Sequence, residues 1–252
     1  WDIAMLQYAF QAVTNMINES SVDIICLCGG KGERLRGLTH DFVPKSLFSV
    51  NGLPLLSYTL DVIPPALVAR LVIAVGHHAD QIKSWASKAD LPYETIFSES
   101  PQGIFPAIQA AMKFCKSQTI IICNSDEIRL GLNVDEVLGF HLSNHNMATM
   151  PVTLSDHLSR HRLLRIDKER TIIESFHKPQ IDDSYRGMIN IGFVVIQKNA
   201  QQYFDNNGDS NWDNVINPLI RNRQLKAIPV DVHYFNVGTT SEFNEASAWL
   251  KS

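Results

Sequence analysis

The chain of 252 residues lacks the patterns that would place it in several common classes of protein. No apolar run approaches the ~20 residues that a membrane-spanning helix requires, so we expect no membrane association. A formal net charge of −4, with no basic stripe outside one loop, argues against a nucleic-acid partner. No Cys-x-x-Cys occurs among its four cysteines, which leaves zinc-ribbon and thioredoxin-type sites without support. We expect buried free thiols and a cytoplasmic protein.

Two common phosphate-binding motifs are also absent, although a glycine-rich loop follows the apolar run 22–27. The loop has neither the Gly-x-x-x-x-Gly-Lys-Ser/Thr of a Walker A motif nor the Gly-x-Gly-x-x-Gly of a dinucleotide-binding turn. Its glycines let backbone N–H groups approach an anion, and cations stand among them. These residues are Gly29, Gly30, Lys31, Gly32, Arg34, Arg36 and Lys45. They favour a polyphosphate ligand; the alternative is a turn whose glycines serve packing alone.

The residues around this loop resemble the signature of a known family. Gly-Gly-x-Gly-x-Arg-Leu (29–35), Leu38-Thr39 and the segment Pro-Lys-Ser-Leu (44–47) are similar to motifs of the sugar-1-phosphate nucleotidylyltransferases. Within that family the chain looks most like mannose- and heptose-1-phosphate guanylyltransferases. The resemblance implies an NTP (GTP favoured) and a sugar 1-phosphate as substrates, and Mg²⁺ as cofactor. It implies catalytic roles for Arg34, Lys45 and Asp126, and nucleotide contacts at Leu27, Gly29, Gly30, Lys31 and Gly32.

Predicted strands alternate with predicted helices in the first part of the chain. The strands are 22–28, 69–75, 94–98 and 119–123, and the helices are 54–63, 79–88, 104–115 and 134–143. This alternation predicts an α/β fold with a doubly wound, mostly parallel sheet, Rossmann-like or GT-A-like, and helices on both faces. Later runs predict a mixed or antiparallel portion with closing helices: strands at 147–153, 161–166, 170–176 and 188–196, and helices at 198–204, 211–221 and 240–250.

The expected organisation is one domain over residues 21–252, with a nucleotide half at about 21–146 and a sugar-phosphate half at about 147–252. Residues 1–20 predict an accessory helix with one apolar stripe. We favour packing of that stripe on the domain; contact with a homo-oligomer or a fusion partner is the alternative. Because Trp1 replaces an initiator Met and no signal-peptide pattern follows, we expect a fragment or a processed end.

Asp126 directly follows the predicted strand 119–123, at the end where an open α/β sheet binds its ligands. An aspartate there can hold Mg²⁺ while the ion bridges phosphate oxygens. The alternative is an Asp that caps a turn. The resembling family usually has Gly before this metal-binding Asp, where this chain has Ser125. A second metal ligand is implied at Asn236, where the family has Asp, and the lost charge should weaken Mg²⁺ binding.

The resemblance also implies contacts with the base and the sugar phosphate. Glu99 and Gly103 lie where the family approaches the nucleobase, and a carboxylate can accept from the N–H groups of guanine. Glu174 begins a segment, ESFHKP, that is similar to the family's sugar-phosphate segment. Within it Lys178 is the expected cation, and His177 replaces a family Glu. Asn190 and Gly192 resemble the next sugar contact. Ordinary turn and strand-edge residues are the alternative at each of these positions.

The predicted reaction joins the NTP and the sugar 1-phosphate into an NDP-sugar and releases pyrophosphate. Positioning and charge neutralisation are sufficient for it, because the substrate phosphate is already the nucleophile. Two alternatives stay open. A GT-A glycosyltransferase shares the architecture but usually has Asp-x-Asp at its metal, whereas Asn124 stands first here. A nucleotide-sugar-binding or regulatory module would account for the replacements at Ser125, His177 and Asn236.

Overall fold

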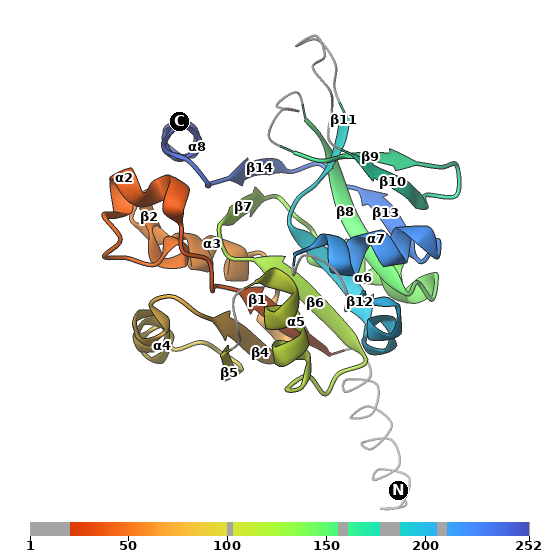
Figure 1. Cartoon of the computed structure of the whole chain (residues 1–252), viewed down its shortest axis with the longest axis horizontal. Coiled ribbons are helices and arrows are strands. Elements are labelled where there is room, and N and C mark those ends of the chain that lie inside the picture. Colours follow the sequence, from red (N-terminus) through yellow and green to blue (C-terminus); the bar gives the residue numbers. More distant parts are fainter. Residues whose placement is uncertain (1–20, 100–102, 156–160, 177–186, 206–210, 252) are drawn as a thin grey trace, which may run out of the picture.

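The computed structural model describes residues 21–99, 103–155, 161–176, 187–205 and 211–251 (Figure 1). The large sheet consists of β1 (Val22–Leu27), β4 (Val68–Val75), β5 (Glu94–Glu99), β6 (Thr119–Asn124), β8 (Ala148–Ser155), β9 (Leu163–Ile166), β10 (Ile172–Phe176), β11 (Gly187–Asn190), β12 (Phe193–Gln197) and β13 (Leu225–Pro229). Two short ribbons pair β2 (Ser49–Val50) with β3 (Leu53–Pro54) and β7 (Glu127–Leu130) with β14 (His233–Asn236). The α-helices are α2 (Arg36–Thr39), α3 (Leu55–Asp61), α4 (Ala79–Lys88), α5 (Ile104–Met112), α6 (Val134–Ser143), α7 (Asp213–Arg221) and α8 (Thr240–Trp249).

The large sheet has a parallel portion and an antiparallel portion. Its order is β10-β9-β11-β8-β12-β6-β1-β4-β5, with β13 paired to β8. Strands β6, β1, β4 and β5 pair in parallel, whereas β12 runs antiparallel to both β6 and β8. This arrangement confirms the predicted α/β sheet with an antiparallel portion late in the chain. The carboxyl ends of the parallel strands therefore meet at one edge.

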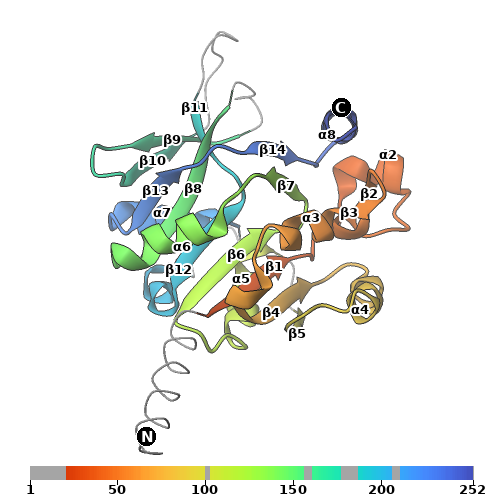
Figure 2. The ribbon, with the colours of Figure 1, turned by 180° about the vertical axis from the view of Figure 1, so that it is seen from behind.

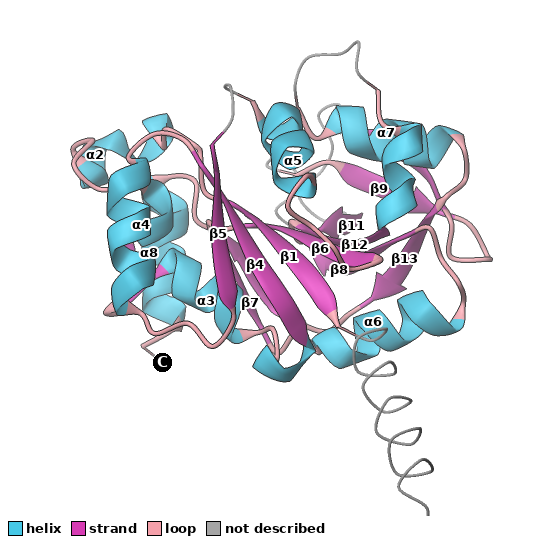
Figure 3. Ribbon diagram, turned by 90° about the horizontal axis from the view of Figure 1, so that it is seen from below, coloured by secondary structure: helices cyan, strands magenta, loops and turns pink. Residues whose placement is uncertain are grey.

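Helices cover both faces of the sheet, as predicted (Figure 3). Alternation along β1 explains how one buried strand serves two cores: Ile25 packs with residues of α5 and α7, and its neighbour Ile24 packs with residues of α3, α4 and α6. Figure 2 shows the second of these layers from behind. A smaller core joins α8 to the segment that contains Leu35 and to Ile128 of β7. This smaller core fixes the far side of the glycine-rich loop.

Several local predictions were wrong. The run 188–196 forms two strands, because Gly192 turns the chain with a φ of +62° between β11 and β12. The β7–β14 ribbon and β13 were not predicted, and 198–203 form a 3-10 helix. His141, on the helix predicted over 134–143, is fully buried. Burial lowers the pKa of its imidazole to about 4.

The four cysteines are all buried and free, as the sequence predicted. Burial raises the pKa of the Cys115 thiol to about 12, which keeps it protonated and unreactive. Among the described residues, no helix is long and apolar enough to cross a membrane. The accessory helix predicted for residues 1–20 lies outside the described part of the chain.

Candidate active site

The strand order favours a ligand site between β1 and β6. Strands β4 and β5 extend the sheet on one side of β1, whereas β6 lies on its other side. Ligands of open α/β sheets bind beyond the carboxyl ends of the strands at such a reversal. Leu27 at the end of β1 stands beside Asn124 at the end of β6 in parallel register. The glycine-rich loop and the segment containing Asp126 therefore leave the sheet side by side.

The glycines of the loop serve different purposes. Gly29 packs on Gly76 at the end of β4, and a Cβ added to Gly76 would lie 3.0 Å from the Gly29 carbonyl oxygen. Gly32 has a φ of +63°, which favours glycine, and it lies against the side chain of Lys45. An added Cβ at Gly30 would have no atom of another described residue within 4 Å, apart from its chain neighbours. Gly30 therefore leaves the backbone open to a ligand, and the predicted nucleotide contact Lys31 is exposed beside it.

Lys45 and Asp126, both predicted to act in catalysis, form an ion pair across this site. Lys45 belongs to a 3-10 turn, Lys45–Leu47, that follows buried Pro44. The two side chains are 12% and 28% exposed, so a ligand at the sheet edge can still reach them. Because the residues are 81 positions apart, only the tertiary fold creates this pair.

The structure also brings Arg34 and Asn236 to this edge. Asn236 stands opposite Glu127 in the β7–β14 ribbon, and the N–H of Val237 donates to the Asp126 carbonyl oxygen at 3.0 Å. A Cβ added to Gly238 would lie 3.1 Å from Arg34 Nη2 and 3.4 Å from Asn236 Oδ1. The two predicted metal ligands thus come from adjacent backbone segments, with the Arg34 guanidinium nearby.

Helix α8 does not depend on Asn236 for its cap. Thr239 Oγ1 accepts from the N–H of Glu242 at 3.3 Å, and the Glu242 carboxylate accepts from the N–H of Gly238 at 2.9 Å. This reciprocal arrangement is a capping box, which satisfies N–H groups at the start of the helix. The amide oxygen of Asn236 is therefore not needed for capping.

A buried ion pair between Arg129 and Glu127, which the sequence did not reveal, holds together the segments next to the site. Arg129 is fully buried and donates from Nη2 to the Glu127 carboxylate at 2.7 Å. The same guanidinium donates to the carbonyl oxygens of Ile191 at 2.6 Å and Gly192 at 2.8 Å. It also reaches the carbonyl oxygen of Asn124 at 3.3 Å, so it links β6, β7 and the turn before β12.

Burial and the neighbouring positive charge shift the pKa of Glu127, the other member of this pair, in opposite directions. Burial raises the pKa of the Glu127 carboxyl, and the Arg129 guanidinium opposes that rise. Asn124 Nδ2 donates to the same carboxylate at 2.9 Å. Tyr234 lies next to it, and burial raises the pKa of the Tyr234 phenol well above its usual range. The pair is therefore surrounded by hydrogen-bonding partners, which a buried charge requires.

Gly192 was predicted to let a sugar approach. In the structure, the Glu127–Arg129 pair already requires a glycine at this position. A Cβ at Gly192 would overlap the Glu127 carboxylate. Asn190, the predicted sugar contact, accepts through Oδ1 from the N–H of Gly192 at 2.8 Å and from that of Phe193 at 3.4 Å. Its side-chain oxygen thus holds the β11–β12 turn, which stands beside the end of β6.

Two hydroxyl groups make contacts that the sequence did not predict and tie the strand ends together. Ser125 Oγ donates to the carbonyl oxygen of Leu27 at 2.7 Å. Thr59 Oγ1 of α3 lies 3.2 Å from the carbonyl oxygens of both Asn124 and Glu127. Replacement of the family's Gly by Ser125 therefore adds a cross-strand bond beside Asp126, rather than only removing flexibility. A Ser after a strand gives no sequence signal for such a contact.

The residues predicted to meet the base lie at the same edge but farther along it. Glu99 ends β5 and is exposed, and Lys83 Nζ of α4 donates to its carboxylate at 2.5 Å. That hydrogen bond lowers the pKa of the Glu99 carboxyl. Gly103 precedes α5 with a φ of +118°. The residues between them, 100–102, lie outside the described part of the chain.

The sugar-phosphate residues are only partly placed. Glu174 lies on β10, the strand at the opposite end of the sheet order from β5, and its carboxylate pairs with Arg165 at 3.0 Å. The described contacts do not bring Glu174 to Asp126. Lys178 and His177 lie outside the described residues, so their roles stay predictions.

Comparisons with known proteins agree with the fold. A family model described as nucleotidyl transferase matches residues 23–252. The "Bifunctional protein GlmU" of Methanococcus maripaludis (strain C7) is 23% identical over 222 residues, which cover 86% of this chain and 51% of that protein. The D-glycero-alpha-D-manno-heptose 1-phosphate guanylyltransferase of Campylobacter jejuni is 21% identical over 225 residues, 87% of this chain and 96% of that protein. The chain spans 51% to 64% of the first four curated relatives that it matches.

Solved structures share the fold. The crystal structure of HddC from Yersinia pseudotuberculosis complexed with GMP-PN superposes with a TM-score of 0.71 at 20% identity, covering 91% of this chain and 99% of that one. A UDP-glucose pyrophosphorylase complexed with UDP-glucose gives a TM-score of 0.74 at 13% identity, covering 92% and 99%. At these identities the likeness establishes the architecture and leaves the base and sugar open.

Proposed function

This chain belongs to the nucleotidyl transferase family, and from that premise we propose that it joins an NTP and a sugar 1-phosphate into an NDP-sugar. The observation that carries the proposal is the convergence of the glycine-rich loop, Lys45 and Asp126 where the strand order reverses. A phosphate oxygen of the sugar 1-phosphate attacks the α-phosphorus of the NTP. The bond from that phosphorus to the β-phosphate oxygen breaks, and pyrophosphate leaves.

The residues at the site have distinct roles in this proposal. The open backbone at Gly30, with Gly29 and Gly32 on either side, cradles the triphosphate. The cations Arg34 and Lys45 offset the negative charge that develops during transfer. Catalysis by such groups consists of positioning and charge neutralisation, so no protein nucleophile is needed.

Oxygen donors at the site fit a magnesium ion. Asp126 supplies a carboxylate and Asn236 an amide oxygen, from backbone segments joined by the Val237-to-Asp126 hydrogen bond of 3.0 Å. Mg²⁺ is commonly held by one or two protein oxygens together with substrate phosphates and water. When bound, the ion would polarise the phosphoryl oxygens; this chain supplies its anchor. The Lys45 ammonium is paired with Asp126 in this structure, and in the proposal it pairs with a phosphate of the bound substrate instead.

We further propose GTP as the preferred nucleotide and a heptose- or mannose-type sugar phosphate as the acceptor. Support comes from the position of Glu99 at the carboxyl edge, and from the names of the Campylobacter and Yersinia proteins described above. Nucleotide contacts belong to residues of about 21–146 and sugar-phosphate contacts to about 147–252, within one domain. The panel that tests this uses GTP, ATP, UTP, CTP and dTTP against mannose, glucose and heptose 1-phosphates. A preference for CTP or dTTP of more than tenfold, ~1.4 kcal/mol, overturns the guanine assignment.

Exchange of labelled pyrophosphate tests the reaction class. A nucleotidyltransferase incorporates label into NTP when it is given the matching NDP-sugar and Mg²⁺. A glycosyltransferase and a nucleotide-sugar-binding module do not. The binding module is the second candidate, because Asn236 removes one negative charge from the metal ligands that the family carries. If no exchange occurs with any NDP-sugar that corresponds to an NTP and a sugar 1-phosphate of the panel, the result would favour that module over the enzyme.

A further inference from the structure

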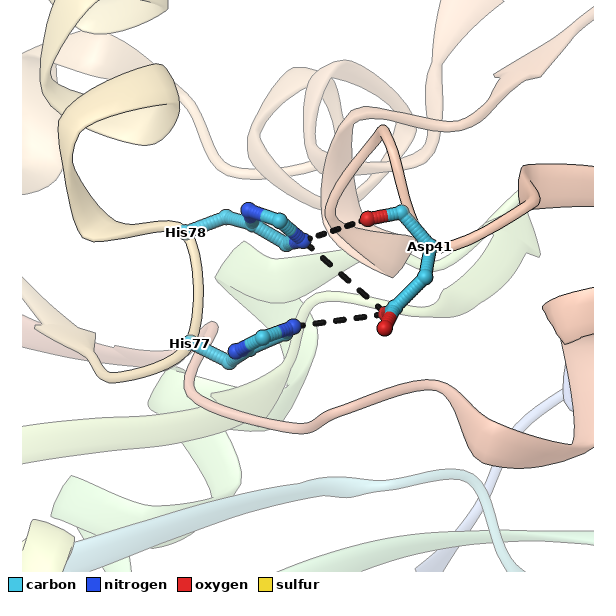
Figure 4. A group of neighbouring side chains, drawn as sticks. All are labelled: Asp41, His77 and His78. Atoms are coloured by element: carbon cyan, nitrogen blue, oxygen red, sulfur yellow. Dashed lines mark hydrogen bonds and ion pairs between the residues drawn. The ribbon is translucent and has the colours of Figure 1, made fainter.

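A second cluster of potential ligands lies away from Asp126, on segments that flank the glycine-rich loop. Asp41 stands in the turn after α2, and His77 and His78 stand between β4 and α4 (Figure 4). One ligand atom from each of the three residues lies within 4.8 Å of the others. We propose that Asp41, His77 and His78 form a binding site for a divalent transition-metal ion of the zinc type.

The distances between the ligand atoms suit such an ion. Zinc bonds of about 2.0–2.2 Å in tetrahedral geometry place neighbouring ligand atoms about 3.3–3.6 Å apart. His77 Nε2 lies 3.3 Å from Asp41 Oδ1, and His78 Nε2 lies 3.9 Å from the same oxygen. The first distance already matches, and the second requires a side-chain shift of about half an ångström. Side-chain exposures of 42%, 38% and 24% for Asp41, His77 and His78 leave room for a water as fourth ligand.

The donor atoms distinguish this site from the one at Asp126. Imidazole nitrogens suit zinc, cobalt, nickel and copper, whereas Mg²⁺ and Ca²⁺ prefer oxygen ligands. Asp126 and Asn236 offer oxygen alone. Asp41 with two histidines offers two nitrogens and one carboxylate, the type of set that catalytic and regulatory zinc sites use. The two sites should therefore select different metals from the same solution.

The backbone holds the three side chains in position without a metal. Asp41 and His78 adopt φ values of +61° and +59°, which are uncommon for residues other than glycine. Gln81 Nε2 of α4 donates to the carbonyl oxygen of Phe42 at 2.9 Å, which ties this helix to the turn that contains Asp41. His78 Nε2 lies 2.8 Å from the Asp41 carbonyl oxygen, and the metal would replace this hydrogen bond. Strained backbone of this kind persists where the surroundings fix it, and it clusters at ligand sites.

A metal at this cluster would join two segments that border the active site. Gly76, which packs on Gly29 of the glycine-rich loop, directly precedes His77. Asp41 lies four residues before Lys45. Bound zinc would therefore fix the turn that leads to Lys45 against the end of β4. The site rests on its own geometry, so it does not require the proposed reaction to be correct.

Matched substitutions by asparagine test the site, because asparagine tolerates left-handed backbone and lacks the imidazole. The variants are His77→Asn, His78→Asn and Asp41→Asn, and the control is His40→Asn, which changes an exposed neighbour whose φ is +46°. The metal-free chain of residues 1–252 is titrated with Zn²⁺ by calorimetry in excess Mg²⁺. Co²⁺ serves as the spectroscopic probe, since four-coordinate Co²⁺ absorbs strongly in the visible range.

We expect one Zn²⁺ per wild-type chain, and a strong visible absorption with Co²⁺. His77→Asn, His78→Asn and Asp41→Asn should each weaken Zn²⁺ binding by about tenfold or more, since loss of a group that only hydrogen-bonds to a metal ligand already costs that much. His40→Asn and Asp126→Ala should bind as wild type does. Equal affinity in the wild type and the three ligand variants would overturn the proposal. Loss of the Zn²⁺ equivalent in Asp126→Ala, or a faint six-coordinate Co²⁺ spectrum in the wild type, would overturn it as well.

Discussion

Replacement of the buried Arg129 by methionine tests how the active-site edge is held. Methionine matches much of the volume of the side chain but removes the charge and every donor. Glu127, which is 4% exposed, would then keep a buried carboxylate without its cation. The carbonyl oxygen of Ile191 would also lose the donor that now lies 2.6 Å away. The Asn124 and Gly192 carbonyl oxygens keep other donors, Thr59 Oγ1 and the N–H of Asn124.

The expected cost follows from these contacts. Removal of one partner of a buried pair costs about 3–5 kcal/mol of unfolding free energy. For a domain of this size that corresponds to a fall of about 6–20 °C in the melting temperature. The matched control is Arg165→Met, which breaks the exposed pair with Glu174 and should cost about 1 kcal/mol or less. Urea unfolding followed by circular dichroism measures both.

The pH dependence separates loss of charge pairing from loss of packing. In Arg129→Met the pKa of the folded Glu127 rises further above its unfolded value, because the guanidinium that opposes the effect of burial is gone. The folded state then keeps a proton that the unfolded chain releases above about pH 4.3, so the deficit grows as the pH rises. The deficit should therefore be smaller at pH 5 than at pH 8, and Glu127→Gln in the same chain should recover part of it. A loss equal to that of Arg165→Met, or one that does not change with pH, would refute the reasoning.

Three further predictions concern separate parts of the chain. Asn236→Asp should lower the Mg²⁺ concentration needed for half-maximal turnover from a millimolar-scale value without changing nucleotide choice, because a carboxylate binds the ion better; steady-state kinetics at varied Mg²⁺ measures this. The folded pKa of His141, about 4, lies below the usual 6.5, so wild-type stability should fall by up to about 3 kcal/mol between pH 6.5 and 4, and unfolding of His141→Gln should show a shallower fall. Deletion of residues 1–20 should leave kcat unchanged while lowering stability or altering oligomer mass, since every predicted site residue follows Val22; loss of kcat with melting temperature and mass unchanged would contradict this.

The sequence was sufficient to predict the parallel core and which motif residues would lie at its carboxyl edge. Long apolar runs such as 119–123 identify buried strands, and motif residues that directly follow them must lie at the carboxyl edge. The glycine-rich loop and Asp126 could therefore be assigned to one edge before any contact was known. Helices α4 and α6 were predicted at their observed bounds, 79–88 and 134–143, because their apolar spacing is regular.

Contacts that depend on pairs distant in the chain were not predictable. Strand β7 contains Glu127 and Arg129, so its composition suggests a polar turn, although both residues are buried and pair with each other. The sequence could not show that Gly192 must accommodate the Glu127 carboxylate. Likewise, Asp41 and the two histidines lie 36 and 37 positions apart, and no local spacing signals their convergence. The buried pair, the requirement for glycine at position 192 and the histidine cluster all arise only when distant segments pack together in the fold.

The central claim is that Lys45 and Asp126 at the strand reversal carry nucleotidyl transfer. The most direct measurement is pyrophosphate release from GTP in the presence of mannose or heptose 1-phosphate, for the wild type, Lys45→Met and Asp126→Ala, with Arg221→Met of α7 as an exposed-charge control. We predict release that depends on the sugar phosphate in the wild type and the control, and a fall of about 10²-fold or more in each site variant, a loss expected when one group that stabilises transition-state charge is removed. Full activity in Asp126→Ala would contradict the account.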